Sequence, residues 1–375
     1  MLIADGEVIA AVAAQRAAIA DTAAFVHAHP ELGHQEHQCA AHLAGRLAEA
    51  GLRVEPGVAG LGTAFRAALT GGRAGRRVGV VALYDAVAAV REDGSVQAVH
   101  SCGHGLIAGA VAGAALALAT LREQMAGELA VVGCPADEIH APGTALSGGG
   151  KQLMAAAGVW DDYDAVLYAH PEFIDTVWQA SLWMRRDTFT VAGMRSLRDD
   201  VAQPPVEAIG TVLRAVAGFP RARLMLERLV LDGDVEEGTG LVLTGALLYF
   251  GDDEAGIERT ALDVRSALAG AAWRTGPLVP GLRPDASVTA AVAAAFAAAG
   301  RGFEPDPPPL PFATDFASVS HRVPAALIGV GRPEGWAFHT DQGAAQFASP
   351  AALDVAADMA AVLALAAVRL SEPAP

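Results

Sequence analysis

In the first half of the chain, short continuous apolar runs alternate with longer helical stretches. The apolar runs are Arg77–Tyr84, Glu128–Cys134 and Asp164–Ala169, and each stops at a polar residue or a proline. Runs without polar alternation are typical of strands that are buried on both faces. Between them, Leu106–Leu121 and Gly150–Ala157 have the composition of helices. This alternation predicts an α/β fold with a helix-covered, mixed or parallel sheet.

The two ends of the chain are predicted to be mainly helical. Residues 1–52 show alanine-rich amphipathic spacing that is interrupted at His29-Pro30. The last apolar run, Pro350–Leu370, contains Asp354 and Asp358, so we expect a helix that packs on the surface of the fold.

The pattern changes near Arg185, where apolar and polar residues begin to alternate as in half-exposed strands. The elements expected in this segment are the strand Asp187–Val191, the helix Pro205–Val216, the strand Leu241–Phe250 and the helix Ile257–Trp273. Later residues return to the first pattern, with a helix over Ser287–Ala299 and a strand over Ala325–Val330. We therefore predict one domain made of residues 1–184 and 284–375, interrupted by a smaller α+β domain over residues 185–283.

Composition and charge narrow the classes of function. Hydrophobic residues make up 53% of the 375 residues, and the net charge is −16. This charge disfavours nucleic acid and anionic membrane surfaces as partners and leaves a small molecule as the expected substrate. The three cysteines are too scattered for a disulfide framework, which favours a reducing cytoplasm.

Several polar side chains directly follow the predicted strands. Asp85, Asp137, Glu138 and His170 each come just after the C-terminal end of an apolar run. In open α/β sheets this edge is where ligands bind. The pair Cys102 and His104 precedes the helix Leu106–Leu121, and its sulfur and nitrogen could bind one transition metal. The alternative is that Cys102 and His104 are ordinary loop or helix-cap residues.

Two common catalytic motifs are missing. The run Gly148–Lys151 is not a phosphate-binding loop, because Ala145 stands where the first glycine is needed and Gln152 follows the lysine. No Gly-x-Ser-x-Gly motif occurs, which disfavours a serine hydrolase of the usual α/β type.

An ordered set of short motifs covers nearly the whole chain. They are His29–Gly33, Ala82–Ala86, His100–His104, Gly133–Glu138, Gly150-Lys151, Ala169–Pro171, Thr314-Asp315, Val319–His321 and His339-Thr340. In this order they resemble the zinc-dependent M20 metallopeptidases. The resemblance is closest to the amidohydrolase branch of that family, which contains aminobenzoyl-glutamate hydrolase-like and N-acyl amino acid hydrolase proteins.

The resemblance implies a catalytic core interrupted by a ferredoxin-like lid, with homodimers formed through the lid. It also implies two divalent metal ions, with zinc the first choice and manganese, cobalt or nickel as alternatives. The residues at the positions of the metal ligands are Cys102, His104, Glu138, His170 and His339. Glu138 would bridge the two ions, and Asp137 would be the general base that takes a proton from the attacking water. Asp85 would orient a ligand, although a simple strand-end cap is an alternative.

The sequence also departs from the family pattern. Asp137 replaces the usual Glu and is one methylene shorter, and Gly105 replaces the usual Asp or Asn. In the lid, Leu197 occupies the place of the histidine that stabilises the oxyanion. Arg195 or Arg198 could supply the missing positive charge and bind substrate; the alternative is that both are solvated surface residues.

Three hypotheses about the function follow. The first is a metal-dependent amidohydrolase that cleaves the amide bond of a small N-acyl amino acid- or dipeptide-like substrate through a metal-activated water. The second is a metalloenzyme of this fold used for a condensation, cyclisation or lyase step, and the altered lid keeps it open. The third is a non-catalytic homologue, which the complete set of metal-competent residues disfavours.

Overall fold

The computed structural model describes residues 2–139, 141, 144, 147–194, 205–220, 222–234, 239–310 and 312–373. The chain forms two compact units. Unit 1 comprises Met1–Gln179, Arg283–Pro308 and Asp315–Pro375, and unit 2 comprises Ala180–Leu282 and Pro309–Thr314. The sequence placed residues 185–283 in the second domain, whereas unit 2 begins earlier and includes a second segment. The reason is a parallel bridge between Ser181 and Leu310, which joins that segment to the start of the unit.

A six-stranded mixed sheet forms the centre of unit 1, with the strand order β1-β2-β6-β3-β7-β12. The strands are β1 (Arg53–Pro56), β2 (Phe65–Thr70), β6 (Ala126–Gly133), β3 (Arg73–Ala82), β7 (Ala165–Glu172) and β12 (Ala325–Gly331). The last four are mutually parallel, while β2 runs antiparallel to both β1 and β6. This arrangement confirms the predicted helix-covered mixed sheet.

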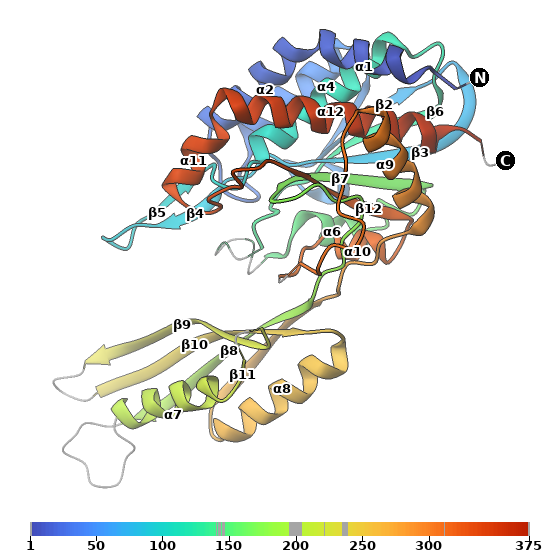
Figure 1. Ribbon diagram of the computed structural model, residues 1–375. Helices are drawn as coiled ribbons and strands as arrows, with labels where there is room; N and C mark the ends of the chain where they lie inside the picture. The colour runs from blue at the N-terminus through green and yellow to red at the C-terminus, as the bar shows by residue number, and fades with distance from the viewer. Residues whose placement is uncertain are drawn as a thin grey trace. The chain divides into compact units, whose positions relative to one another are not determined.

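Helices cover both faces of this sheet (Figure 1). One layer contains α1 (Asp5–Ala14), α2 (Arg16–Ala28), α4 (His104–Thr120) and α12 (Pro350–Ser371), and the other face holds α6 (Gly150–Ala156) and α10 (Ala317–Ser320). The remaining elements are α3 (His37–Glu49), the 3₁₀ turn η1 (Val58–Gly60), α9 (Ala286–Ala298), α11 (Asp341–Phe347) and the hairpin of β4 (Val87–Val90) and β5 (Val96–Val99). The apolar strands are therefore buried between two helical layers, as their sequence predicted.

Close packing of α4 against α2 explains the unusual residue Gly105. A Cβ atom at Gly105 would lie 2.9 Å from the backbone oxygen of Ala23, and one at Gly109 would lie 2.6 Å from the backbone oxygen of Ile19. The next glycine on this face, Gly113, lies against the side chain of Ile19. These distances are shorter than real Cβ contacts, so glycine is required for the two helices to approach this closely.

The last helix, α12, is buried more deeply than the sequence suggested. Asp354 is exposed and Asp358 half-buried, but from Val362 to Ser371 nearly every side chain is buried. The prediction of a surface-packed helix is wrong for this second half, because α12 lies between α4, α9 and the sheet. By length and hydropathy alone α12 could also cross a membrane, as could α1 and α2 taken as one bent span. In the fold, however, 67% of the most apolar window of α12 is buried within unit 1.

Unit 2 has the element order βαββαβ around a four-stranded antiparallel sheet. Its elements are β8 (Trp183–Met194), α7 (Pro205–Ala217), β9 (Leu224–Asp234), β10 (Thr239–Gly251), α8 (Glu254–Ala267) and β11 (Ala272–Val279). The strand order β11-β8-β10-β9 is that of a ferredoxin-like fold. Apolar side chains of β10, including Leu243, Leu247 and Tyr249, pack with those of α7 and α8 to form a separate core.

One predicted helix in unit 2 was too long. The sequence predicted a helix over Ile257–Trp273, but α8 ends at Ala267 and Trp273 lies in β11, paired with Phe189. Gly270 has a φ of +96°, which reverses the chain between the helix and the strand. Along β11, which lies at one edge of the sheet, only Val279 is buried.

Candidate metal centre

The carboxyl ends of three parallel strands and the first turn of α4 deliver the candidate residues to one edge of the sheet. Asp85 follows β3, and Asp137 and Glu138 follow β6. His104 is the first residue of α4. His170 was predicted to lie just beyond its strand, but it lies near the C-terminal end of β7, paired with Gly329 of β12.

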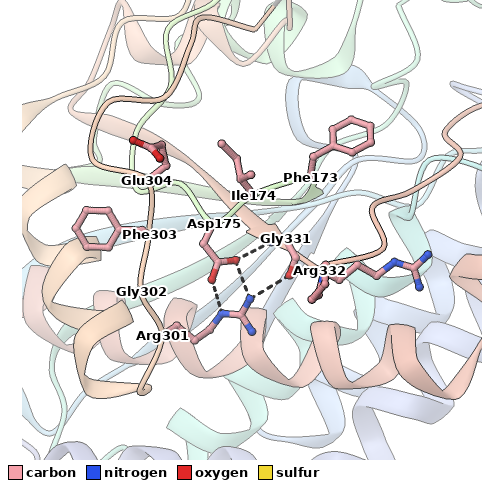
Figure 2. Close-up of a pocket in the computed structure, with 10 residues that line it drawn as sticks. Phe173, Ile174, Asp175, Arg301, Gly302, Phe303, Glu304, Gly331 and Arg332 are labelled. Carbon is pink, nitrogen blue, oxygen red and sulfur yellow. Dashed lines mark hydrogen bonds and ion pairs between the residues drawn. The ribbon is translucent and has the colours of Figure 1, made fainter.

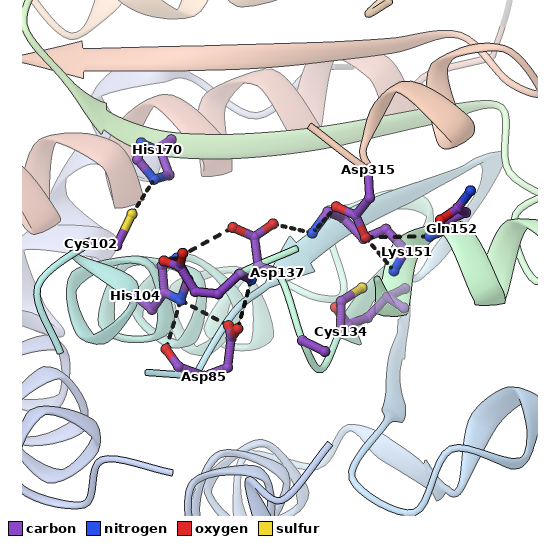
Figure 3. A network of polar contacts seen from close by, with 12 residues as sticks. Asp85, Cys102, His104, Cys134, Asp137, Lys151, Gln152, His170 and Asp315 are labelled. Carbon is purple, nitrogen blue, oxygen red and sulfur yellow. Dashed lines mark hydrogen bonds and ion pairs between the residues drawn. The ribbon is translucent and has the colours of Figure 1, made fainter. Parts of the chain in front are cut away.

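The five predicted metal ligands lie close together in two overlapping groups. In each group, one ligand atom from every residue lies within 4.8 Å of the others. The groups are Cys102, His104 and His170, and Cys102, Glu138 and His339. The Sγ atom of Cys102 lies 3.6 Å from Nε2 of His170, and Oε1 of Glu138 lies 3.6 Å from Nε2 of His339 (Figure 3 shows the first contact). Cys102 belongs to both groups.

Two of these histidines are oriented through their other ring nitrogen. Nδ1 of His104 lies 2.8 Å from the backbone oxygen and 2.9 Å from the carboxylate of Asp85. Nδ1 of His170 lies 2.7 Å from the backbone oxygen of Pro171 and 3.5 Å from the carboxylate of Glu172. These contacts turn Nε2 of each ring toward the cluster, as is common for metal-binding histidines. Sequence reasoning did not find Glu172, which no strand-end pattern distinguished from its neighbours.

Asp85 contacts two members of the cluster. Besides the contact with His104, its Oδ2 atom accepts a hydrogen bond of 2.9 Å from the backbone nitrogen of Glu138. The residue is 1% exposed, so both contacts are buried. Asp85 thus connects the end of β3 to the ligand loop after β6. These contacts go beyond those of a residue that only caps its own strand.

The backbone at the cluster takes conformations that are unusual for its residues. Ala136 has a φ of +55° and His339 a φ of +59°, both in the left-handed region. Such conformations cost free energy and persist where surrounding contacts fix them. The backbone nitrogen of Ala136 donates a 2.8 Å hydrogen bond to the buried carboxylate of Glu36, and that of His339 donates one of 2.9 Å to the oxygen of Ser101. Both ligand loops are therefore tied down next to their functional side chains.

The donor atoms fit a transition metal. Nε2 of His104 and Oε1 of Glu138 are buried, and neither makes a hydrogen bond to another of the described residues. A buried polar atom left this way costs free energy unless something binds it. Sulfur, imidazole nitrogen and carboxylate oxygen together form a set that suits zinc and neighbouring transition metals.

The protonation of the cluster reflects its dense negative charge. Burial opposes ionisation of Cys102, but its interactions with His104, His170 and His339 outweigh burial and lower the pKa of the thiol. Burial lowers the pKa of His170, but Cys102 and Glu172 reverse this effect and raise it to about 10. Burial and the charge on Cys102 raise the pKa of Glu138. Without metal, protons on the imidazoles therefore balance the negative charge of the cluster, which a divalent cation would otherwise balance.

The proposed general base Asp137 lies beside the cluster and makes an ion pair that the sequence did not predict. Its Oδ2 atom lies 3.4 Å from Nε2 of His104, and its Oδ1 atom contacts Nζ of Lys151. Burial would raise the pKa of Asp137, but the Lys151 ammonium and His104 outweigh burial and lower it. Lys151 also binds Asp315, at 2.7 Å from Oδ1. Both residues belong to motifs that the sequence matched without giving them a role.

Arg195, Arg198 and Leu197 lie outside the described residues. Their predicted roles therefore stay predictions from the sequence.

A separate surface pocket of about 450 Å³ lies in unit 1 between the ends of β7 and β12 (Figure 2). Its lining includes Phe173, Asp175, Arg301 and Arg332. The guanidinium of Arg301 donates to Asp175 at 2.7 and 2.8 Å and to the backbone oxygen of Gly331 at 3.0 Å. These internal contacts occupy Arg301, so its presence does not point to a bound anion.

Comparisons with known proteins agree with this arrangement. The profile described as peptidase family M20/M25/M40 matches residues 80–366. One of the subunits of the p-aminobenzoyl-glutamate hydrolase of Escherichia coli is 35% identical over 176 residues, which are 43% of this chain and 34% of that protein. The match thus spans about a third of the relative's length.

Two solved structures share the whole fold. A dinuclear metal-binding peptidase of the M20 family from Bacillus subtilis superposes with a TM-score of 0.67 at 20% identity, covering 95% of this chain and 99% of that one. An aminobenzoyl-glutamate utilization protein from Klebsiella pneumoniae gives 0.68 at 15% identity, covering 96% and 97%. At these identities the likeness shows the common fold.

Proposed function

The chain belongs to peptidase family M20/M25/M40, and from this membership we propose that it is a metal-dependent amidohydrolase. Its reaction would be cleavage of the amide bond in a small N-acyl amino acid- or dipeptide-like substrate through a metal-activated water. The single observation that supports this most is the pair of ligand groups sharing Cys102, with the carboxylate of Asp137 beside them.

We propose that Cys102, His104 and His170 hold one divalent ion and that Cys102, Glu138 and His339 hold a second. When bound, such ions lower the pKa of water and polarise an amide carbonyl. Glu138 was predicted to bridge the ions. Its Oε1 atom lies 3.8 Å from Nε2 of His104 and 3.6 Å from that of His339, so it reaches a histidine of each group. Zinc is the first choice, with manganese, cobalt and nickel as alternatives.

Three carboxylates of the chain have separate roles in this reaction. Asp137 is held ionised by Lys151 and so is able to accept a proton from the attacking water and return it to the leaving amine. Asp85 and Glu172 fix the rings of His104 and His170. Because His104 and Asp85 are almost fully buried, the electrostatic interactions among these groups are only weakly screened by water.

The substrate class rests on the relatives. The Escherichia coli protein is named as part of a p-aminobenzoyl-glutamate hydrolase, and the named substrate contains an amide between an aromatic acyl group and an amino acid. A net charge of −16 argues against a polyanionic substrate and is compatible with a small molecule. We further propose a cytoplasmic homodimer that forms through unit 2.

A second candidate is a metalloenzyme of this fold that performs a condensation, cyclisation or lyase step. The observation that favours it is Leu197, which stands where the family has its oxyanion-stabilising histidine. Loss of one such donor costs about 10²–10³ in rate for hydrolysis.

The proposal can be tested with the purified full-length chain. Elemental analysis should find close to two divalent ions per chain, and a panel of N-acyl amino acids and dipeptides, read by mass spectrometry, should yield free amine and acid. Asp137→Asn should reduce this cleavage to a low residual rate while keeping the metal content. Asp162→Asn, at a side chain that is 85% exposed, is the matched control and should keep full activity. Absence of bound metal would refute both candidates, whereas products other than hydrolysis products would favour the second.

A further inference from the structure

Lys151 is the single lysine in a sequence whose other basic residues are all arginine, apart from the histidines. Its side chain is completely buried at the start of α6. A buried ammonium is costly and is normally retained only where it is paired. Lysine places a compact point charge here, whereas the guanidinium found elsewhere in the chain is broader and planar.

Two carboxylates share this ammonium, and they differ in their surroundings. Asp315 is fully buried and is fixed by three interactions: Nζ of Lys151 at 2.7 Å, and the backbone nitrogens of Lys151 and Gln152 at 3.0 and 3.4 Å from its Oδ2 atom. A Cβ atom at Gly149 would lie 2.4 Å from that same oxygen, so glycine there gives Asp315 its place. Asp315 is thus a rigid anchor behind the lysine.

Asp137, on the other side of Lys151, is 14% exposed at its side chain and faces the metal cluster. One carboxylate oxygen contacts Nζ of Lys151, while the other lies 3.4 Å from Nε2 of His104 (Figure 3). The residues form a chain that runs from Asp315 through Lys151 and Asp137 to His104. Burial alone would lower the pKa of Lys151, but Asp137 and Asp315 raise it above its ordinary value, so the ammonium stays charged.

We infer that Lys151, anchored by Asp315, is a positioning residue that fixes the carboxylate of Asp137 against the metal centre. Lys151 is completely buried and acts through Asp137 instead of touching substrate. The role matters here because Asp137 is one methylene shorter than the Glu usual at this position, so small displacements of its carboxylate change its reach. The catalytic consequence rests on the proposed function, whereas the placement of Asp137 by Lys151 does not.

The single lysine makes a direct test possible. Lysine-selective ¹⁵N and ¹³C labelling of the full-length protein should give one side-chain ammonium signal with slow solvent exchange. Asp137→Asn and Asp315→Asn should each shift this signal and speed its exchange, and the exposed control Asp162→Asn should leave it unchanged. A signal that Asp137→Asn does not move would overturn the inference, whether or not the protein is active.

Kinetics of the metal-loaded protein test the consequence. Lys151→Met together with Asp315→Asn removes both charges of the anchor, and we expect kcat to fall about 10- to 100-fold with KM and metal content unchanged. Lys151→Arg keeps the positive charge and should recover part of this loss. In an Asp137→Asn background the same double change should have no further effect on kcat, since Lys151 acts through Asp137.

Equal losses in both backgrounds would mean that the anchor is merely structural and would overturn the inference. If the double variant does not fold, the labelling result with Asp137→Asn decides. If the labelling shows the pairing but the metal-loaded wild type cleaves no amide, the proposed function fails and the positioning of Asp137 stands.

Discussion

The packing of α4 on α2 gives a prediction in which one chemical change has opposite effects at two sites. Gly109→Ala would place a Cβ atom 2.6 Å from the backbone oxygen of Ile19. Gly45→Ala, in α3, would place it where no heavy atom lies within 4 Å. Alanine favours a helix over glycine by about 0.5–1 kcal/mol, so Gly45→Ala should stabilise the protein by that amount.

At Gly109 the packing cost exceeds this gain. Ordinary contact begins near 3.4 Å, so α2 would have to move by about 0.8 Å (3.4 minus 2.6), and the obstructing atom belongs to the backbone. Overpacking of this kind costs roughly 1–3 kcal/mol. Gly105 and Gly113 on the same face also lie close to α2, so a shift of the helix is restricted. We expect Gly109→Ala to lower the free energy of unfolding by about 1–2 kcal/mol.

Urea unfolding followed by circular dichroism measures both variants against the wild type. Hydrogen exchange of α4 peptides should localise the loss at Gly109 to unit 1, to which α4 belongs. If Gly109→Ala proves as stabilising as Gly45→Ala, the close approach of the two helices is wrong, and with it the explanation for Gly105.

Three further predictions concern the site. Gly105→Asp restores the family residue but places a Cβ atom 2.9 Å from the oxygen of Ala23, so we expect both the urea midpoint and the metal content to fall; unchanged values would show that the helices accept a side chain there. Burial and the charge on Asp85 raise the pKa of Glu36 to about 7, so the stability of its protonated form is present below the ordinary value of 4.5 and is lost as the pH rises toward 7. Glu36→Gln should therefore gain stability relative to the wild type between about pH 5 and pH 8, by roughly 2–3 kcal/mol, in urea titrations at the two values; a constant difference would contradict the shift. Chelation should lower the thermal midpoint, since ions at about 1,000 times their dissociation constant stabilise the folded protein by about 4 kcal/mol. The affinity for the ions should weaken at acidic pH, because Cys102 and the histidines must lose protons to bind them. Calorimetry with and without chelator checks both.

Much of unit 1 could be predicted from the sequence because its signals are local. The apolar runs that became β3, β6 and β7 are continuous, and strands of this kind need burial on both faces. Their ends fixed the rim to which Asp85, Asp137 and Glu138 belong. The strands β1 and β2, which complete one side of the sheet, were missed, since their short segments have no comparable run.

The sequence by itself determined the membership in the M20 family and the identity of the residues that gather at the sheet edge, because motif order and strand-end position are properties of the chain. Only the tertiary structure decided how those residues are held. Lys151 and Asp315 lie 164 positions apart, and their contact depends on the packing of α6 against α10. The glycine at position 105 looked like a lost polar contact in the sequence, and the fold shows it to be a requirement of helix packing. Pairings across such distances in the chain follow from three-dimensional packing, which no local pattern records.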